Sequence, residues 1–243
     1  MLHQVVRFRS IAPLIDELGG GELLDVGSGS QGVAGWIGPG WSVTAVDRSF
    51  EDIGAMRGPR DARARTVEGD ARELPFGDRS YDAVLALDVL EHIEPEDRGR
   101  VLGELVRTAR RRVIVAGPCG AAAFRADMRL AAGLRRRGLP RPSWLEEHER
   151  NGFPSAGDLR AGLAPFGELR ISGGENVRWH GLLFTFEFRR PGAALSRAAS
   201  RWIAAGLGSG SGAALPARAA ARLVEGPRRA PYYRTIAVLD LET

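Results

Sequence analysis

The chain has 243 residues, of which 44% are hydrophobic and 26% are charged, as is typical of a soluble globular domain. It contains no run of about 18 uncharged apolar residues, which argues against a membrane-spanning helix, and its charged first segment does not resemble a signal peptide. The single cysteine, Cys119, excludes an internal disulfide and a cysteine-based zinc cluster. We therefore expect one domain, residues 1–243, in the cytoplasm.

The charge of the chain is unevenly distributed. Residues 1–118 contain 15 Arg and 19 acidic residues, a net charge of −4, whereas residues 119–243 contain 19 Arg and 11 acidic residues, a net charge of +8. A basic half fits an anionic small molecule, a membrane surface or nucleic acid, and it also fits a solvated arginine-rich surface. Aromatic residues are not interleaved with the arginines as in base-stacking platforms, so we do not expect nucleic acid as a partner. Peripheral contact with a membrane stays open.

In the first half, short apolar runs alternate with helical patterns. Residues 4–18 predict one helix, which ends at Gly19–Gly21. Further helices are predicted at Gln31–Ile37, Phe50–Arg57 and Glu94–Arg110, and buried strands at Glu22–Gly27, Trp41–Asp47, Arg65–Asp70, Tyr81–Asp88 and Arg112–Gly117. This alternation predicts an α/β fold with a Rossmann-like, doubly wound parallel sheet.

The second half is less regular. Strands are predicted at Leu169–Ser172 and Tyr232–Leu241. Helices are predicted at Ala121–Leu134, at Ala156–Ala164 with Ser155 as its cap, at Trp179–Arg189 with a strand as the alternative, and within the Ala- and Arg-rich residues 193–226. The region before the last strand is therefore expected to be a helical insertion.

A glycine-rich turn follows the first strand, in the segment LLDVGSGSQG at residues 23–32. Glycine lets the backbone turn sharply and lets a ligand lie against bare peptide, and such turns occur in several nucleotide-binding folds. Asp25 stands two residues before the first glycine, where its carboxylate can hold a cationic amino group or cap the turn.

Acidic residues also end the next three strands. Asp47 lies 20 residues after Gly27 and can accept hydrogen bonds from both hydroxyls of a ribose. Asp70 can accept the exocyclic amine of adenine, while the Ala71 N–H can bond to a ring nitrogen. Asp88 opens the segment DVLEHI, at the end of the fourth strand.

These motifs together resemble those of class I methyltransferases that use S-adenosylmethionine, in particular the small-molecule branch that includes ubiquinone and menaquinone methyltransferases. The resemblance is carried by the glycine turn, by the segments GDA at 69–71 and LPF at 74–76, and by residues 82–92. It implies a cofactor-binding core at 19–118, a seven-stranded, mostly parallel sheet whose last strand in sequence is antiparallel, and S-adenosyl-L-methionine as cofactor. The implied reaction moves a methyl group to an O, N or C atom of a small molecule, for which lipid, quinone and sugar-containing acceptors fit the basic second half.

By the same resemblance, residues at the strand ends form the cofactor site: Asp25, Gly27 and Gly29 along the methionine part, Asp47 at the ribose, Asp70 and Ala71 at the adenine, and Asp88 and Val89 beside the sulfonium. His92 follows near the acceptor, and residues 119–155 and 174–230 are expected to form a lid or insertions on the acceptor side.

Two histidines are candidate catalytic residues. His92 could accept a proton or only start a helix, and His148, expected in a loop after the fifth strand, could act as a base or lie in an acidic surface patch. Cys119 is not expected to act as a nucleophile, because nothing near it in sequence completes an activating pair. No metal site is expected, because no cluster of acidic residues follows residue 93.

Two other functions remain open at this stage. An NAD(P)-dependent oxidoreductase would share the glycine turn and Asp47, but would leave Asp25 and residues 69–71 and 90–92 unexplained. A non-catalytic S-adenosylmethionine-binding protein would share every cofactor motif.

Overall fold

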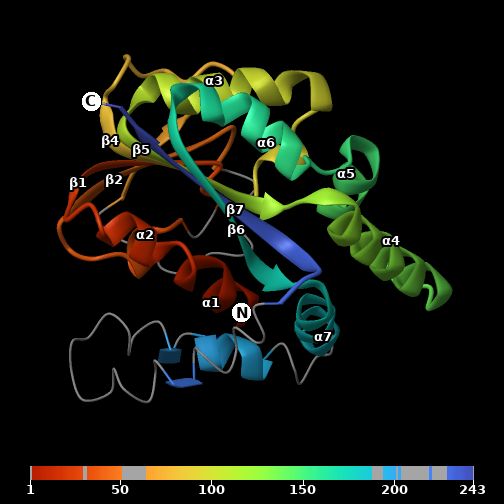
Figure 1. Cartoon of the computed structure of the whole chain (residues 1–243). Coiled ribbons are helices and arrows are strands. Elements are labelled where there is room, and N and C mark those ends of the chain that lie inside the picture. Colours follow the sequence, from red (N-terminus) through yellow and green to blue (C-terminus); the bar gives the residue numbers. More distant parts are fainter. Residues whose placement is uncertain are drawn as a thin grey trace.

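The computed structural model describes residues 2–29, 32–50, 64–187, 194–200, 202–203, 219–220 and 229–242. Seven strands form one sheet in the order β3-β2-β1-β4-β5-β7-β6 (Figure 1). The strands are β1 Gly21–Val26, β2 Trp41–Asp47, β3 Ala64–Glu68, β4 Tyr81–Leu87, β5 Ala109–Pro118, β6 Gly167–Asn176 and β7 Tyr232–Leu241. Strands β1 to β5 are parallel, whereas β7 runs antiparallel to both β5 and β6, which confirms the predicted Rossmann-like sheet with an antiparallel last strand.

Helices cover both faces of this sheet, α1 and α2 on one and α3 and α6 on the other (Figure 1). The α-helices are α1 Leu2–Arg9, α2 Ala12–Asp16, α3 Arg98–Thr108, α4 Gly120–Arg136, α5 Ser143–Asn151, α6 Ala156–Leu163 and α7 Val177–Glu187. In the described part of the chain, no helix has both the length and the apolar composition needed to cross a membrane.

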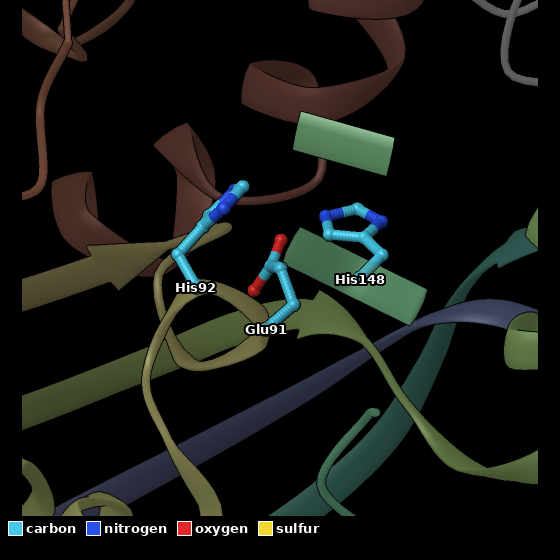
Figure 2. Close-up of side chains that lie close together, drawn as sticks. All are labelled: Glu91, His92 and His148. Atoms are coloured by element: carbon cyan, nitrogen blue, oxygen red, sulfur yellow. The ribbon is translucent and has the colours of Figure 1, made fainter. Parts of the chain in front are cut away.

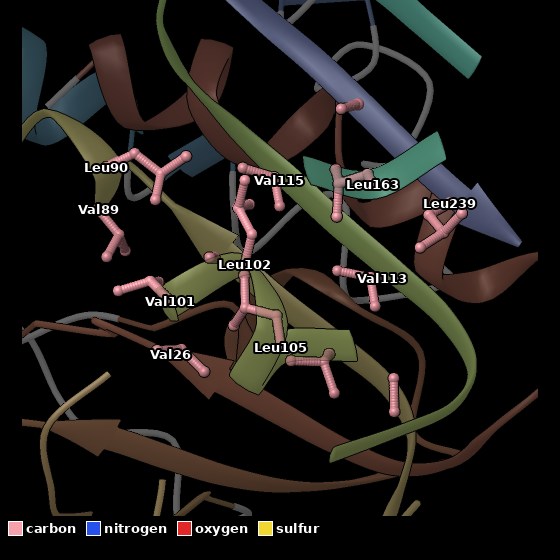
Figure 3. Close-up of a cluster of buried hydrophobic side chains, with 14 of the residues drawn as sticks. Val26, Val89, Leu90, Val101, Leu102, Leu105, Val113, Val115, Leu163 and Leu239 are labelled. Carbon is pink, nitrogen blue, oxygen red and sulfur yellow. The ribbon is translucent and has the colours of Figure 1, made fainter. Parts of the chain in front are cut away.

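Alternate residues of the central strands enter two different cores. Val84 and Ala86 of β4 belong to the core under α3 and α6, whereas Leu85 and Leu87 face the core under α1 and α2. Figure 3 shows the first of these cores, where Val101 and Leu105 of α3 pack among strand residues. Because side chains alternate along a strand, a sheet buried on both faces requires the continuous apolar runs that the sequence contains.

The chain order places the carboxyl ends of β1 and β4 side by side at the centre of the sheet. From β1 the chain moves outward to β2 and β3, and then returns to the other side of β1 to form β4 and β5. Ligands of open α/β sheets bind outside the carboxyl ends at such a reversal of strand order. The fold therefore directs attention to the residues that follow β1, β2 and β4.

Several predicted boundaries need correction. The single helix expected over residues 4–18 is divided into α1 and α2, because Pro13 lacks the N–H that a continuous helix would need there. The helix expected from Glu94 begins only at Arg98, after a 3₁₀ turn at Pro95–Asp97, and Ala109 already belongs to β5. The helix preferred at Trp179–Arg189 is confirmed as α7.

Other expectations fall partly outside the described residues. This applies to most of the helix expected at Phe50–Arg57 and to most of residues 193–226, of which the structure describes a helical segment at 194–200. The boundaries of the predicted lid, 119–155 and 174–230, stay predictions.

Candidate functional site

The glycine turn after β1 packs tightly against the turn after β4. Gly27 has a φ of +65°, and a Cβ atom at this position would lie 2.5 Å from Cγ2 of Val89. The Gly27 N–H donates to the Val46 carbonyl at 2.8 Å, which joins the turn to β2. Only glycine fits both this backbone conformation and this contact. The turn therefore adjoins Val89, as expected for two residues of one site.

Asp25 and Asp47 hold the two sides of this turn. Asp25 is 3% exposed, and its Oδ2 accepts the Val33 N–H at 2.8 Å. Oδ2 of Asp47 accepts the Gly29 N–H at 2.9 Å. Burial raises the pKa of Asp25 to about 6, against the lowering effect of the Val33 hydrogen bond. Both acids thus accept backbone N–H groups in or after the turn. Burial disfavours the ionised form of the Asp25 carboxyl group.

Asp70 and Ala71 lie beyond β3 in a surface turn. The Asp70 carboxylate accepts hydrogen bonds from the backbone N–H and the guanidinium of Arg72, and Arg72 also contacts Asp97 at 3.1 Å. These bonds to Arg72 lower the pKa of Asp70. The Gly69 N–H donates to the Asp47 carbonyl at 2.9 Å, so this turn continues the same edge of the sheet.

Asp88 connects this edge of the sheet to arginines near both ends of the chain. Its backbone has a φ of +57°, a left-handed conformation that a non-glycine residue rarely adopts. Oδ2 of Asp88 lies 3.1 Å from Nε of Arg7 in α1, and Oδ1 contacts the guanidinium of Arg234 in β7. Although burial opposes ionisation, the charges of Arg234 and Arg7 keep the pKa of Asp88 below its usual value. Asp88 is therefore a carboxylate held by two arginines.

A cavity of about 220 Å³ opens beside Asp88. Its wall is formed by residues from α1, the turn after β4, β5, α5, β6, α7 and β7, and they are His3, Arg7, Asp88, Glu91, His92, Pro118, Trp144, His148, Glu175, His180, Phe184, Tyr233 and Arg234. One wall is aromatic, since the rings of His180 and Tyr233 stack with centroids 3.4 Å apart. This cavity, here called the inner pocket, combines five charged side chains and four histidines with aromatic surface.

Both candidate catalytic histidines line the inner pocket, and each is oriented by a carboxylate. His92 Nδ1 lies 2.5 Å from Oε2 of Glu147, and His148 Nδ1 lies 2.7 Å from Oδ2 of Asp127. Their rings lie on either side of the Glu91 carboxylate (Figure 2), with centroids 5.0 Å apart. Burial lowers the pKa of His92, while burial and the charge of Asp88 raise the pKa of Glu91 well above its ordinary value.

The position of His148 differs from the expectation. It lies in helix α5 and is 5% exposed, so neither the loop nor the surface acidic patch is present at this residue. Helix α5 buries its side with Leu145 and His148, and Trp144 and Phe153 contact the His148 ring. The sequence suggested a surface because charged residues surround His148. Of these, Glu146, Glu149 and Arg150 are exposed, whereas Glu147 bonds to His92.

A buried arginine fastens α5 to the turn that carries Glu91 and His92. Arg98 Nε donates to the carbonyl oxygens of Leu90 and Ile93, at 2.9 and 3.2 Å. Its Nη2 donates to the carbonyl oxygens of Asn151 and Gly152, at 2.9 and 2.7 Å, at the end of α5. A guanidinium has five donors in a rigid planar fork, which suits it to bridging two backbone segments. The spatial relation of His92 to His148 is therefore fixed by Arg98.

An open groove of about 440 Å³ runs between α4 and α7 and shares His180 and Phe184 with the inner pocket. Leu130, Leu134 and Phe184 contribute apolar surface to it. Arginines at positions 129, 137 and 178 also line it. We call it the outer groove.

Sequence reasoning missed several residues of this site: Arg7, Glu91, Asp127, Glu175, Tyr233 and Arg234. Arg7 and Arg234 lie far along the chain from Asp88, so no local motif indicates that they pair with it. Asp127 could have been noticed as the single acid on a basic helix, α4, where it is 1% exposed. Cys119 is buried, which raises the pKa of its thiol and agrees with the expectation that it is no nucleophile.

Comparison with known proteins gives one family match. Residues 24–116 match the family described as a methyltransferase domain. No curated protein matches the chain by sequence. The family match covers β1 to β5, including the glycine turn and the turn after β4, but it does not distinguish the ubiquinone and menaquinone branch from others.

Solved structures with a similar fold include phosphoethanolamine N-methyltransferase 2 from Haemonchus contortus, in complex with phosphomonomethylethanolamine and S-adenosylhomocysteine. It has a TM-score of 0.55 and 15% identity over 97% of this chain and 53% of that chain. A Burkholderia thailandensis 1,6-didemethyltoxoflavin-N1-methyltransferase has a TM-score of 0.38 and 25% identity over 47% and 53% of the two chains. Magnesium protoporphyrin IX methyltransferase from Synechocystis PCC 6803 has a TM-score of 0.47 and 20% identity over 70% and 76%. The matched region spans about half the length of the first two proteins, and the likeness to the first shows the fold.

Proposed function

We propose that this chain, whose residues 24–116 match a methyltransferase domain, transfers the methyl group of S-adenosylmethionine to a small molecule held in the inner pocket. The methyl carbon of a sulfonium is already electrophilic. The protein's task is therefore to hold the acceptor atom in line with that carbon, about 3 Å away, and to exclude water.

The contact between Gly27 and Val89 is the observation that carries this proposal. It joins the turn after β1 to the turn after β4, so a ligand lying along Gly27 and Gly29 reaches Asp88 and Val89. In this proposal Asp25 binds the amino group of the methionine part and Asp47 binds the ribose. The bond to the Gly29 N–H uses one carboxylate oxygen of Asp47, which leaves the other for a hydroxyl. Asp70 and Ala71 are assigned to the adenine.

The acceptor lies, in this proposal, beyond Asp88 in the inner pocket. The aromatic wall and the volume of about 220 Å³ suit a ring or a compact polar group. The outer groove continues from it through Phe184 and offers apolar surface with arginines, which suits an acceptor with an apolar extension and an anionic group. Lipid-like, quinone and sugar-containing molecules all stay within this description. His92 and His148 are the residues we assign to the acceptor's reacting group.

Cofactor binding and methyl transfer need separate measurements. S-adenosylhomocysteine should raise the melting temperature of the chain, and NAD should not; the opposite result would favour the oxidoreductase. Tritiated methyl transfer from S-adenosylmethionine into a metabolite extract should label a small molecule. Binding without any labelled product would identify a non-catalytic binding protein.

The ribose assignment has its own test. Asp47→Ala should weaken S-adenosylmethionine binding by about 1–3 kcal/mol, as expected for lost hydrogen bonds to a hydroxyl pair. Asp78→Ala is a matched control, because Asp78 is exposed and pairs with Arg107 away from the strand ends. Equal affinities of the two variants, measured by calorimetry, would show that Asp47 does not contact the cofactor.

A further inference from the structure

We propose that Glu91, His92 and His148 bind a divalent transition-metal ion, and that this ion holds an oxygen atom of the acceptor. The role toward the acceptor rests on the proposed function, whereas the metal site itself does not. The sequence predicted no metal, because no cluster of acidic residues follows residue 93. The third ligand of the proposed site, His148, is a histidine 56 residues after His92.

The three side chains offer one donor atom each within a small volume. These atoms lie within 4.8 Å of one another, and Figure 2 shows the two imidazole rings on either side of the Glu91 carboxylate. Bonds of about 2.0–2.1 Å to a tetrahedral ion separate ligand atoms by about 3.4 Å. Side-chain rotations that bring the most widely separated atoms up to about 1.4 Å closer would complete the site.

The hydrogen bonds of both histidines leave the same nitrogen for the ion. A carboxylate only accepts, so Nδ1–H of His92 donates to Glu147 and Nδ1–H of His148 donates to Asp127. Nε2 then carries the lone pair in each ring. This carboxylate–histidine arrangement is the usual outer shell of a metal site, where it fixes the tautomer and the ring orientation.

His148 supplies an independent indication of a ligand. It is 5% exposed, and its Nε2 is buried without a hydrogen-bond partner, as is Nε2 of His180 outside the triad. A buried polar atom left unpaired destabilises a protein by about 1–3 kcal/mol, so such an atom calls for an explanation. Asp127 is further held by the hydroxyl of Tyr233 at 3.1 Å, so the ring is oriented with its free nitrogen toward Glu91 and His92.

The local charges also favour a cation. Glu91 is 2% exposed, and its carboxyl group can be ionised there only with positive charge beside it. The two arginines of the inner pocket wall, Arg7 and Arg234, are both engaged with Asp88. A divalent ion between Glu91 and the histidines would balance the carboxylate, and Arg98 already holds the two segments in register.

The ligand types indicate the class of metal. Two imidazoles and one carboxylate suit zinc, cobalt, iron or manganese, whereas magnesium and calcium prefer oxygen ligands alone. Three protein ligands leave a position open, as in catalytic zinc sites. An acceptor hydroxyl bound there loses its proton to solvent more readily. The oxygen then forms a bond to the methyl carbon, while the carbon–sulfur bond breaks and its electron pair stays on sulfur.

Cobalt(II) titration of the untagged chain tests the site directly, because cobalt bound by nitrogen and oxygen ligands absorbs visible light. The wild-type chain should bind one equivalent, which Zn²⁺ displaces and Mg²⁺ does not. His92→Gln and Glu91→Gln should each weaken this binding by about 100-fold or more. Glu149→Gln is the control, because Glu149 lies in α5 like His148, but its side chain is 48% exposed and pairs with Arg141 outside the triad.

The outcomes separate the metal site from the proposed function. Absence of saturable cobalt binding, or equal binding by the wild type and the His92 and Glu91 variants, would overturn the proposal. The melting-temperature shift with S-adenosylhomocysteine should persist in these variants, which shows that they fold and that the cofactor site is intact. His148→Gln should lose the cobalt spectrum as well, and the partly exposed His92 provides the same test if His148→Gln does not fold.

Discussion

The two sides of the site are built from contacts of very different sequence separation. On the cofactor side, Asp70 bonds to a residue 2 positions away, Asp25 to one 8 positions away and Asp47 to one 18 positions away. On the acceptor side, His92 meets Glu147 across 55 residues and Asp88 meets Arg234 across 146 residues.

This difference explains why the sequence motifs indicated residues of the cofactor side but not the partners that form the acceptor side. The residues that hydrogen-bond to the acids of the glycine turn lie at most 18 positions away in the sequence, so the geometry of the turn is a local property of the chain. The inner pocket is closed by α1, α5, α7 and β7, which are neighbours only because the sheet order brings them together. Substitutions on each side test whether stability and cofactor binding depend on the two sides separately, from the largest expected effect to the smallest.

Asp88 belongs to both sides of the site, and replacing it should have the largest effect on stability. Asp88→Asn leaves Arg7 and Arg234 without their shared charge partner, so the free energy of unfolding should fall by about 3–4 kcal/mol, measured by urea denaturation. Asp78→Asn breaks a pair in which Asp78 is 76% exposed, and should lower stability by less than about 1 kcal/mol. Similar losses in the two variants would contradict the role of Asp88 as a structural joint.

The glycine turn tests the local side. Gly29→Ala adds only left-handed backbone strain of about 1 kcal/mol, because a Cβ there meets no atom within 4 Å. Gly27→Ala adds the same strain and a collision with Val89, so its total should be about 3 kcal/mol. Chemical denaturation and S-adenosylhomocysteine affinity measure both variants. If Gly29→Ala were as damaging as Gly27→Ala, the packing of Val89 on the turn would not be the deciding contact.

Asp25 should link stability to pH. Its pKa is raised from 3.8 to about 6 in the folded chain, so the folded state binds more protons than the unfolded state between these values. The contribution of Asp25 to stability therefore falls as pH rises from about 4 to about 6, and the deficit stays constant above that. A shift of about 2 units corresponds to about 3 kcal/mol.

Asp25→Asn keeps an oxygen that can accept the Val33 N–H and removes the buried charge. The variant should be more stable than the wild type by about 2–3 kcal/mol at pH 8 and about equal to it near pH 3.5, in denaturant titrations at both values. Its affinity for S-adenosylmethionine should fall, because the amide lacks the charge that we assign to the cofactor's amino group. A stability difference independent of pH would refute the raised pKa.

The smallest effect concerns a local element that lies outside the pocket walls. Ser155 caps α6 in a reciprocal arrangement, in which its Oγ accepts the Asp158 N–H at 3.1 Å and Asp158 accepts the Ser155 N–H at 2.8 Å. Ser155→Ala should lower stability by about 1 kcal/mol in thermal denaturation. Ser143→Ala, at the start of α5 where no side chain caps the helix, should change it by less than about 0.5 kcal/mol.

Much of the fold could be predicted because hydrophobic periodicity, turn residues and helix caps are properties of short segments of the sequence. The strands β1 to β5 and β7, the helix α4 and the Ser155 cap were all expected from the residues within them. The failures were also physical: Pro13 divides a helix that periodicity alone would continue, and His148 was placed in a loop because charged neighbours hid a helix with one buried side. The cofactor residues were proposed from the sequence, and their contacts to the cofactor remain proposals.

The sequence by itself determined where the strands end, which acids follow them, and that Gly27 and Gly29 form the turn between β1 and the next segment. Only the tertiary structure decided that Arg7 and Arg234 meet at Asp88, and that Asp127 and Glu147 orient His148 and His92. The physical reason is the range of the interactions: a turn is specified by a few neighbouring residues, whereas a pocket depends on which helix ends the sheet brings together.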